Sequence, residues 1–245
     1  TVLVTGGARG IGAEIVRTMA DAGADVILHF TSDAEVAGKV ASEIGEHRCR
    51  VLRADFMDDH QIRQLWTDAV AWKGRVDVLV NNAGVFEAAS VEDDFEAWVD
   101  IWQRALQINL IASGHLCREA IPHFRSLGGG IIINIASRAA FRGDDAQYMQ
   151  YAASKGGMVA MHKTIARAFG RENVLSYVLA PGVVRTEMTD VFIAEHGEET
   201  MTRDIPLGEL ATPADVANLA VFLASGKARS ATGTSIDING ASFVR

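Results

Sequence analysis

Tyr151 and Lys155 lie four positions apart in the segment YAASK. Residues at this spacing share one face of an α-helix, so a phenol and an ammonium group can meet there. A nearby positive charge favours the phenolate and lowers the pKa of a phenol, which otherwise lies near ~10. A phenol tuned in this way can exchange protons with an alcohol near neutral pH. The pair therefore predicts acid–base chemistry at a hydroxyl or carbonyl group.

A glycine-rich turn, TGGARGIG, follows the apolar residues 2–4 and leads into an amphipathic helical pattern. Glycines permit positive φ angles and let backbone amides approach a ligand closely. At the start of a helix, free N–H groups and the helix dipole favour a pyrophosphate. No Lys-Ser or Lys-Thr pair follows, so the turn is not a P-loop. The turn and the Tyr-Lys pair together indicate a nicotinamide-dependent oxidoreductase, with cofactor contacts expected from Gly6, Arg9, Gly10, Ile11 and Gly12.

The end of the second apolar run decides which nicotinamide cofactor is expected. Many NAD enzymes carry a carboxylate there, which binds the 2′-hydroxyl of the adenosine ribose. This chain has Thr31 and Ser32 at that place, and Arg9 lies in the glycine turn. Hydroxyls and a guanidinium suit a 2′-phosphate, so NADP(H) is the expected cofactor. NAD(H) stays an alternative, because another loop conformation could bring Asp33 to the ribose.

Short runs rich in Val, Ile and Leu alternate with helical patterns and predict the elements that position these groups. Because the runs are almost continuously apolar, they indicate parallel strands covered on both faces. The predicted fold is α/β, a Rossmann-like, doubly wound parallel sheet of seven strands with helices on both faces. In such sheets ligands bind beyond the carboxyl ends of the strands, at the switch point. The predicted strands are 1–4, 24–30, 49–54, 76–80, 130–135, 174–179 and 234–238, and helical spacing is clear at 59–71 and 213–224.

Length, composition and charge limit the number of domains and the kinds of partner that this chain can have. The 245 residues are 49% hydrophobic and contain no linker or repeat, which predicts one catalytic domain over residues 1–245. A formal charge of -8 without a basic patch argues against nucleic acid or a membrane as partner. Cys49 and Cys117 stand far apart, and the chain has neither a spanning apolar run nor a cationic leader, so we expect a cytoplasmic protein. The histidines form no ligand motif, so no catalytic metal is expected.

Further motifs follow in order along the chain. They are NNAG at residues 81–84, Asn109, Ser137, YxxxK at 151–155, a Pro-Gly pair at 181–182 and the closing TGTSIDINGA. Together with the glycine turn, they resemble the short-chain dehydrogenase/reductase family over essentially the whole chain. The chain is most similar to the short, single-domain members, which include 3-oxoacyl-carrier-protein reductases and many sugar, polyol and steroid dehydrogenases. The resemblance implies hydride transfer between a nicotinamide cofactor and a carbonyl or secondary alcohol.

The resemblance also implies a catalytic tetrad of Asn109, Ser137, Tyr151 and Lys155. Tyr151 would exchange a proton with the substrate oxygen, and Ser137 would position the same oxygen by a hydrogen bond. Lys155 would bias Tyr151 toward phenolate and bond the nicotinamide ribose. Asn109 would hold a proton-relaying water, through its side chain or through a kink in a long helix that starts near residue 93. A solvated or capping amide is the plain alternative for Asn109.

The same motifs imply the remaining cofactor contacts. Asp55 would bind the adenine amino group, or would instead cap the turn that follows it. The backbone of residues 82–84 would flank the adenosine ribose, and residues 181–186 would surround the carboxamide, with transfer of the pro-S hydrogen. These contacts are Asp55, Asn82, Ala83, Gly84, Tyr151, Lys155, Pro181, Gly182, Val184 and Thr186, in addition to the glycine turn, Thr31 and Ser32.

Residues 186–210 occupy the place where family members have a mobile segment that covers the substrate. Met188, Phe192 and Ile193 would add apolar surface there, although a surface pair of helices is the plain alternative. Trp98 and Trp102, spaced i and i+4, predict an apolar helix face for internal packing or for a subunit interface. Because family members commonly pair such helices across a dyad, a homotetramer is expected.

Three functions follow from these observations. The first is NADP(H)-dependent reduction of a ketone, an aldehyde or a 3-oxoacyl group. The second is NAD-dependent oxidation of a sugar or another secondary alcohol. The third is a nucleotide-sensing protein that keeps the fold without catalysis, because a fold alone does not establish a function. The complete tetrad favours an enzyme over a sensor.

Overall fold

Seven strands form one sheet in the order β3-β2-β1-β4-β5-β6-β7. The computed structural model describes the backbone of residues 1–245 and all side chains except those of residues 188, 191, 192 and 196. Every pair of neighbouring strands is parallel. The fold predicted from the sequence is thus confirmed, with strands β1 (Val2–Val4), β2 (Val26–Phe30), β3 (Cys49–Arg53), β4 (Val78–Asn81), β5 (Gly130–Ile135), β6 (Val174–Pro181) and β7 (Ser235–Ile238).

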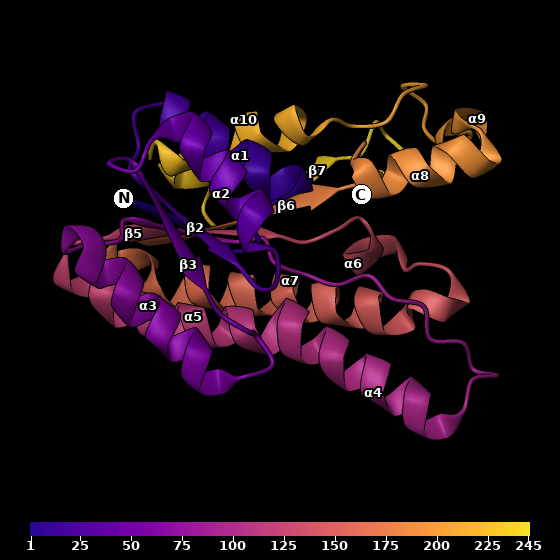
Figure 1. Ribbon diagram of the computed structural model, residues 1–245, viewed down its shortest axis with the longest axis horizontal. Helices are drawn as coiled ribbons and strands as arrows, with labels where there is room; N and C mark the ends of the chain where they lie inside the picture. Colours follow the sequence, from indigo (N-terminus) through magenta and orange to yellow (C-terminus); the bar gives the residue numbers. More distant parts are fainter.

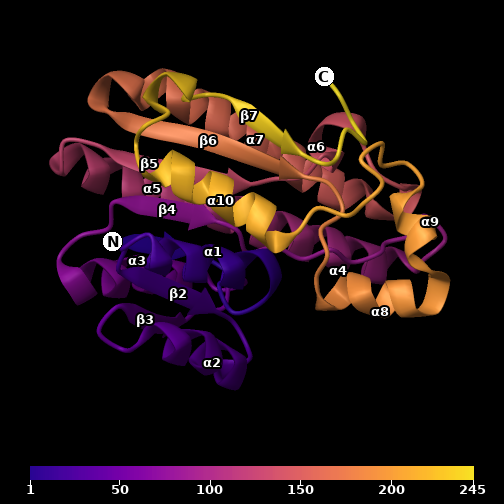
Figure 2. The same ribbon diagram turned by 90° about the horizontal axis from the view of Figure 1, so that it is seen from above.

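The winding of the sheet reverses at β1, which pairs with β2 on one side and β4 on the other. Two layers of helices enclose the sheet, and each layer has its own buried apolar cluster. As Figures 1 and 2 show, one layer holds α1 (Gly10–Asp21), α2 (Ala34–Ile44) and α10 (Pro213–Ala224), and the other holds α3 (Asp59–Lys73), α5 (Ala112–Ser126) and α7 (Met149–Phe169).

Burial explains the composition of the strands. All residues of β1, β2, β4 and β6 are buried, whereas the edge strands β3 and β7 are partly exposed. A strand covered on both faces needs apolar side chains at consecutive positions, so the usual alternation disappears. Among the residues with described structure, no helix is long and apolar enough to cross a membrane.

The long helix expected from residue 93 consists of three pieces. Helix α4 (Phe95–Leu106) starts after Asp94, whose carboxylate accepts hydrogen bonds from the amides of Glu96 and Ala97 at 3.1 and 3.4 Å. A π-helical turn, Gln107–Ile111, follows, and α5 continues from it. Such turns re-aim side chains and are frequent at functional sites. This one contains Asn109.

Short helices lie beyond the carboxyl ends of β5 and β6 (Figure 1). Helix α6 (Ala139–Arg142) follows β5, and α8 (Glu187–His196) and α9 (Glu198–Thr202) follow β6. The backbone of segment 186–210 therefore forms the pair of helices named as the plain alternative. Ile193 is partly buried, whereas the side chains of Met188 and Phe192 lie outside the described residues.

Candidate active site

The glycine turn forms a backbone cradle between β1 and α1. Gly6 and Gly10 have positive φ angles of 62° and 52°, which explains why glycine stands at both positions. A Cβ atom added at Gly12 would clash with the carbonyl oxygen of Gly6 and would lie 2.5 Å from Asn82 Nδ2. Helix α1 begins at Gly10, so the amides of its first turn have no acceptor within the helix and are free to bind a ligand. The cradle suits an anion at the helix N-terminus.

A network of hydrogen bonds joins the glycine turn to the loop after β4. The Asn82 side-chain amide donates to the carbonyl oxygens of Thr5 and Gly6 at 2.9 and 3.1 Å. The Thr5 hydroxyl accepts from the amides of Asn82 and Ala83 at 2.9 and 3.0 Å. Two segments that the sequence assigns to the same cofactor are therefore directly bonded to each other.

Three of the predicted catalytic side chains meet at the carboxyl end of β5. The Ser137 hydroxyl lies close enough to the Tyr151 phenol to lower its pKa. Lys155 Nζ lies 5.8 Å from the centroid of the Tyr151 ring and donates to the carbonyl oxygen of Ile135 at 2.8 Å. Lys155 is only 3% exposed. A phenol, a hydroxyl and an amine thus share one small, largely buried volume.

Burial controls the charge of this cluster. It raises the pKa of Tyr151 to about 12, because the effect of burial exceeds the lowering by the nearby Ser137 side chain, and the negative charge of Asp144 raises the pKa further. Burial lowers the pKa of Lys155 to about 8. The net pKa shift of Tyr151 is thus opposite to the lowering that the sequence predicts, because burial outweighs the groups around the phenol. At neutral pH the phenol is protonated and can donate a proton.

Asn109 is fully buried and connects two walls of the site. Its Oδ1 accepts from the amide of Val85 at 2.8 Å, and its Nδ2 donates to the Val85 carbonyl oxygen and to Ser154 Oγ, both at 3.0 Å. A Cβ atom added at Gly84 would lie 3.2 Å from Asn109 Oδ1 and 3.4 Å from Lys155 Nζ. The amide is thus neither solvated nor a helix cap, and the predicted kink is present as the π-helical turn.

Charged side chains surround the loop after β2. Arg9 forms an ion pair with Asp33, which also caps α2 by accepting from the amide of Val36 at 3.1 Å. Arg53, at the end of β3, donates from Nε to the Thr31 carbonyl oxygen at 3.0 Å. Arg53 is not among the residues predicted for the site, although a cation at the end of a strand next to β2 is a signal that the sequence contains. Ser32 is exposed on the same loop.

Asp55 adopts the capping role named as its alternative. Its Oδ1 accepts from the amide of Met57 at 2.9 Å, and its own amide donates to Gln61 Oε1 at 2.9 Å. These bonds fix the loop between β3 and α3. The other carboxylate oxygen, Oδ2, makes no hydrogen bond among the described residues.

The loop after β6 runs back toward the glycine turn. Gly182 donates its amide to the Ile238 carbonyl oxygen at 2.9 Å, and Val184 forms a bridge with Ala211. Thr186 caps α8, and its Cγ2 would be 3.4 Å from a Cβ atom added at Gly10. The predicted contacts at Pro181, Gly182, Val184 and Thr186 therefore lie on one continuous loop that reaches the cradle.

An aromatic cluster stands beside the Tyr151 phenol, and it includes Phe86, which is not among the residues predicted for the site. Phe86 stacks on Tyr148 with ring centroids 3.9 Å apart and planes 13° apart, and it meets Tyr151 edge-on at 4.8 Å. Phe86 is 42% exposed. The sequence contains a signal for Phe86, because this aromatic residue stands two positions after the NNAG motif.

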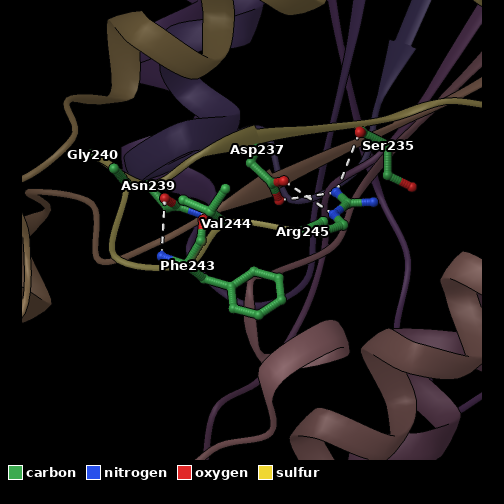
Figure 3. Close-up of a pocket in the computed structure, with 8 residues that line it drawn as sticks. Ser235, Asp237, Asn239, Gly240, Phe243, Val244 and Arg245 are labelled. Carbon is green, nitrogen blue, oxygen red and sulfur yellow. Dashed lines mark hydrogen bonds and ion pairs between the residues drawn. The ribbon is translucent and has the colours of Figure 1, made fainter.

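A cavity lies apart from these residues, between β7 and the C-terminal tail (Figure 3). It measures about 460 Å³ and contains the ion pair of Arg245 with Asp237. None of the predicted site residues lines it. Among the described residues, no group of three or more His, Cys, Asp or Glu side chains could hold a metal ion.

Comparisons with known proteins point to one family. The profile of a family described as enoyl-(acyl carrier protein) reductase matches residues 6–241. The 3-oxoacyl-[acyl-carrier-protein] reductase of Aquifex aeolicus is 32% identical, over 98% of this chain and 96% of its own length. The 3beta-hydroxysteroid dehydrogenase 1 of Eggerthella lenta is 33% identical, over 98% of this chain and 92% of its own length.

A solved structure has the same fold. It is a 7 alpha-hydroxysteroid dehydrogenase complexed with NADH and 7-oxo glycochenodeoxycholic acid. Its TM-score to this chain is 0.89 at 30% sequence identity, covering 98% of this chain and 92% of the other. With matches of this extent, the chain belongs to the short-chain dehydrogenase/reductase family of nicotinamide-dependent oxidoreductases.

Proposed function

We propose that this protein transfers hydride between NADP(H) and a carbonyl or secondary alcohol, with Asn109, Ser137, Tyr151 and Lys155 as its catalytic tetrad. The observation that carries the proposal is the gathering of the Ser137 hydroxyl, the Tyr151 phenol and the buried Lys155 amine in one place. This group lies next to Gly84, whose loop is bonded to the glycine turn. Acid–base groups and a nucleotide cradle thus adjoin each other.

The cradle fits a dinucleotide. The amides of Gly10, Ile11 and Gly12 make no backbone hydrogen bond among the described residues, so they can bind a pyrophosphate. Residues 82–84 would flank the adenosine ribose, and residues 181–186 would hold the carboxamide. The unbonded Oδ2 of Asp55 could accept a bond from the adenine amino group even though Oδ1 caps the turn. Lys155 would reach the nicotinamide ribose.

In the reductive direction Tyr151 donates its hydroxyl proton to the carbonyl oxygen while hydride forms the new C–H bond, which yields an alcohol and a phenolate. Ser137 donates a hydrogen bond to the same oxygen and holds it in line with the phenol. The charged Lys155 favours the phenolate that remains. Asn109 fixes the Val85 backbone, and its π-helical turn is the candidate for holding a water that returns a proton. The nicotinamide, when bound, supplies or accepts the hydride.

The charges and hydroxyls around the loop after β2 favour NADP(H) over NAD(H). Arg9 and Arg53 flank the loop of Thr31 and Ser32, so a 2′-phosphate would meet two cations and hydroxyl donors. Asp33 already pairs with Arg9 and caps α2, so its carboxylate has partners within the protein. A 2′-phosphate would compete with Asp33 for Arg9. Steady-state assays at a fixed substrate should give the higher kcat/KM with NADPH, and a higher value with NADH would favour the NAD-dependent alternative.

The substrate is proposed to be a ketone, an aldehyde or a 3-oxoacyl group. The relatives include 3-oxoacyl-carrier-protein reductases and hydroxysteroid dehydrogenases, and the exposed Phe86 adds apolar surface beside Tyr151. A panel of carbonyl compounds and alcohols, followed by nicotinamide absorbance, tests the proposal. Turnover of at least one carbonyl supports it. Preferential oxidation of sugars with NAD would favour a sugar or alcohol dehydrogenase.

We also propose one domain over residues 1–245, with segment 186–210 covering the substrate, and a homotetramer in the cytoplasm. The single sheet supports the first point. Trp98 and Trp102 lie 4.9 Å apart on α4, and Phe95 beside them is 73% exposed, which supports a subunit contact there. The two free, buried cysteines suit a reducing compartment.

A further inference from the structure

His29 lies near the end of β2, and the mechanism above gives it no role. Its side chain is fully buried. Nδ1 lies 3.1 Å from the amide of Gly6, and Nε2 lies 3.0 Å from the carbonyl oxygen of Ala54. The ring stacks on Phe56, with centroids 4.3 Å apart and planes 6° apart. One imidazole therefore joins the glycine turn to the loop after β3.

The bonds to Gly6 and Ala54 together require one tautomer of the His29 ring. The Gly6 amide can only donate, so Nδ1 must carry a lone pair. The Ala54 carbonyl oxygen can only accept, so Nε2 must carry the hydrogen. Burial lowers the pKa of His29 to about 4, which keeps the ring neutral at pH 7. The neutral Nε2–H tautomer satisfies both partners, whereas the other tautomer and the charged ring each break the bond to Gly6.

The backbone of His29 holds the same turn. Its carbonyl oxygen accepts from the amide of Gly7 at 2.8 Å. Two consecutive amides of the cradle, those of Gly6 and Gly7, are thus bound by one residue. The free amides of α1 follow a few residues later, so the direction of the turn at Gly6 decides where they point. At the other nitrogen, Ala54 directly precedes Asp55, the residue assigned to the adenine.

We propose that His29 is a positioning residue for the cofactor. Its Nε2–H tautomer holds the glycine turn and the Asp55 loop at the separation that the adenosine half of the dinucleotide requires. This inference rests on the proposed function, because it concerns the same nucleotide site. The described contacts of His29 do not include Ser137, Tyr151 or Lys155. Its loss therefore weakens cofactor binding and leaves the chemical step intact.

Fluorescence titration with NADPH and NADH tests this role in three variants. His29→Leu removes both ring hydrogen bonds and should raise the cofactor Kd on the order of tenfold to a hundredfold. His29→Asn keeps an acceptor close to the backbone and should recover part of the affinity. His162→Leu is the matched control, because His162 is also fully buried but bonds to Ser176 at 2.8 Å within α7 and β6. The control should keep the Kd of the wild type.

Kinetics separate positioning from a purely structural role. At saturating cofactor, His29→Asn should keep kcat within roughly twofold while the KM for cofactor rises. An unchanged Kd in His29→Leu overturns the inference, and so does an equal loss of affinity in His162→Leu. A wild type that binds neither cofactor overturns the proposed function itself, which is a distinct result.

One measurement needs no variant. The ¹⁵N resonances of the His29 ring in the wild-type protein report the tautomer directly. At pH 7 they should show a neutral ring with hydrogen on Nε2. A ring with hydrogen on Nδ1, or a charged ring, would contradict the inference even if the His29 variants fail to fold.

Discussion

At the scale of single residues, burial sets the charge state of the two groups proposed to handle the proton. The Tyr151 phenol has its pKa raised to about 12, and the Lys155 amine has its pKa lowered to about 8. Both shifts disfavour the charged form, as expected when solvent is removed from a titratable group. The site is therefore set to donate a proton at neutral pH, which suits reduction better than oxidation.

The pH dependence of the two directions should differ. Reduction needs a protonated phenol and a charged amine, so its kcat/KM should stay level up to about pH 8 and fall above it, as Lys155 loses its proton. Oxidation needs phenolate, so its kcat/KM should rise with pH without a plateau below pH 8. Assays in both directions across this range decide the point. A plateau of oxidation in the acid range would show that the pKa of Tyr151 is lowered.

Lys155→Met should stabilise the protein while it removes activity. The folded pKa of Lys155 lies about two units below its unfolded value of ~10.4, so holding the charge destabilises the fold at pH 7. Loss of the bond to Ile135 offsets part of the gain, which leaves about 1–2 kcal/mol in the free energy of unfolding. The gain should shrink above pH 8, where the folded wild type loses its proton before the unfolded chain does. Urea denaturation at pH 7 and pH 10 measures both effects, and a variant less stable at pH 7 would contradict the argument.

At the scale of elements, the site depends on loops that bond to one another beyond the strand ends. The sequence could predict which loops these are, because glycines, NNAG and Pro-Gly follow apolar runs. It could not predict that Asn82 bonds the glycine turn, or that Phe86 stacks on Tyr148, because both contacts join segments far apart in the chain. The direction of the Tyr151 pKa shift could not be predicted either, because helical spacing carries no information on burial.

Gly12→Ala and Gly38→Ala form a matched pair that tests the cradle. A Cβ atom at Gly12 would clash with the Gly6 carbonyl oxygen, whereas one at Gly38 would meet nothing within 4 Å on the surface of α2. Gly12→Ala should raise the cofactor Kd at least about tenfold, because the turn must open. Gly38→Ala should keep the Kd and add about 0.5–1 kcal/mol of stability. Calorimetric titration and thermal unfolding measure the two effects, and equal affinities in both variants would contradict the assigned cradle.

At the scale of the whole molecule, the parallel seven-stranded sheet and its two helical layers agree with the prediction, because seven apolar runs separated by helical patterns permit few other arrangements. Helix α4 carries a partly exposed aromatic face, which packing within this chain does not explain. The half-buried rings of Trp98 and Trp102 lie 4.9 Å apart, next to Phe95, which is 73% exposed. A neighbouring subunit would cover this aromatic face.

Phe95→Glu should weaken that assembly. A carboxylate in an apolar interface loses its hydration without gaining a partner, so the tetramer should dissociate into smaller species. Light scattering coupled to gel filtration measures the mass, and Val244→Glu, at an exposed apolar residue in the C-terminal tail, serves as control. A wild type of monomeric mass would remove the proposed assembly, and an unchanged tetramer in Phe95→Glu would move the interface elsewhere.

The central claim is that Tyr151 transfers the proton while a nicotinamide cofactor is bound beside it. Tyr151→Phe removes the hydroxyl alone and leaves the ring packed against Phe86. Cofactor titration and single-turnover kinetics on the same variant test the claim most directly. The account predicts a cofactor Kd close to that of the wild type and a turnover rate lower by about a hundredfold to ten-thousandfold, the range expected for loss of a general acid. Turnover at the wild-type rate, or loss of cofactor binding, would contradict it.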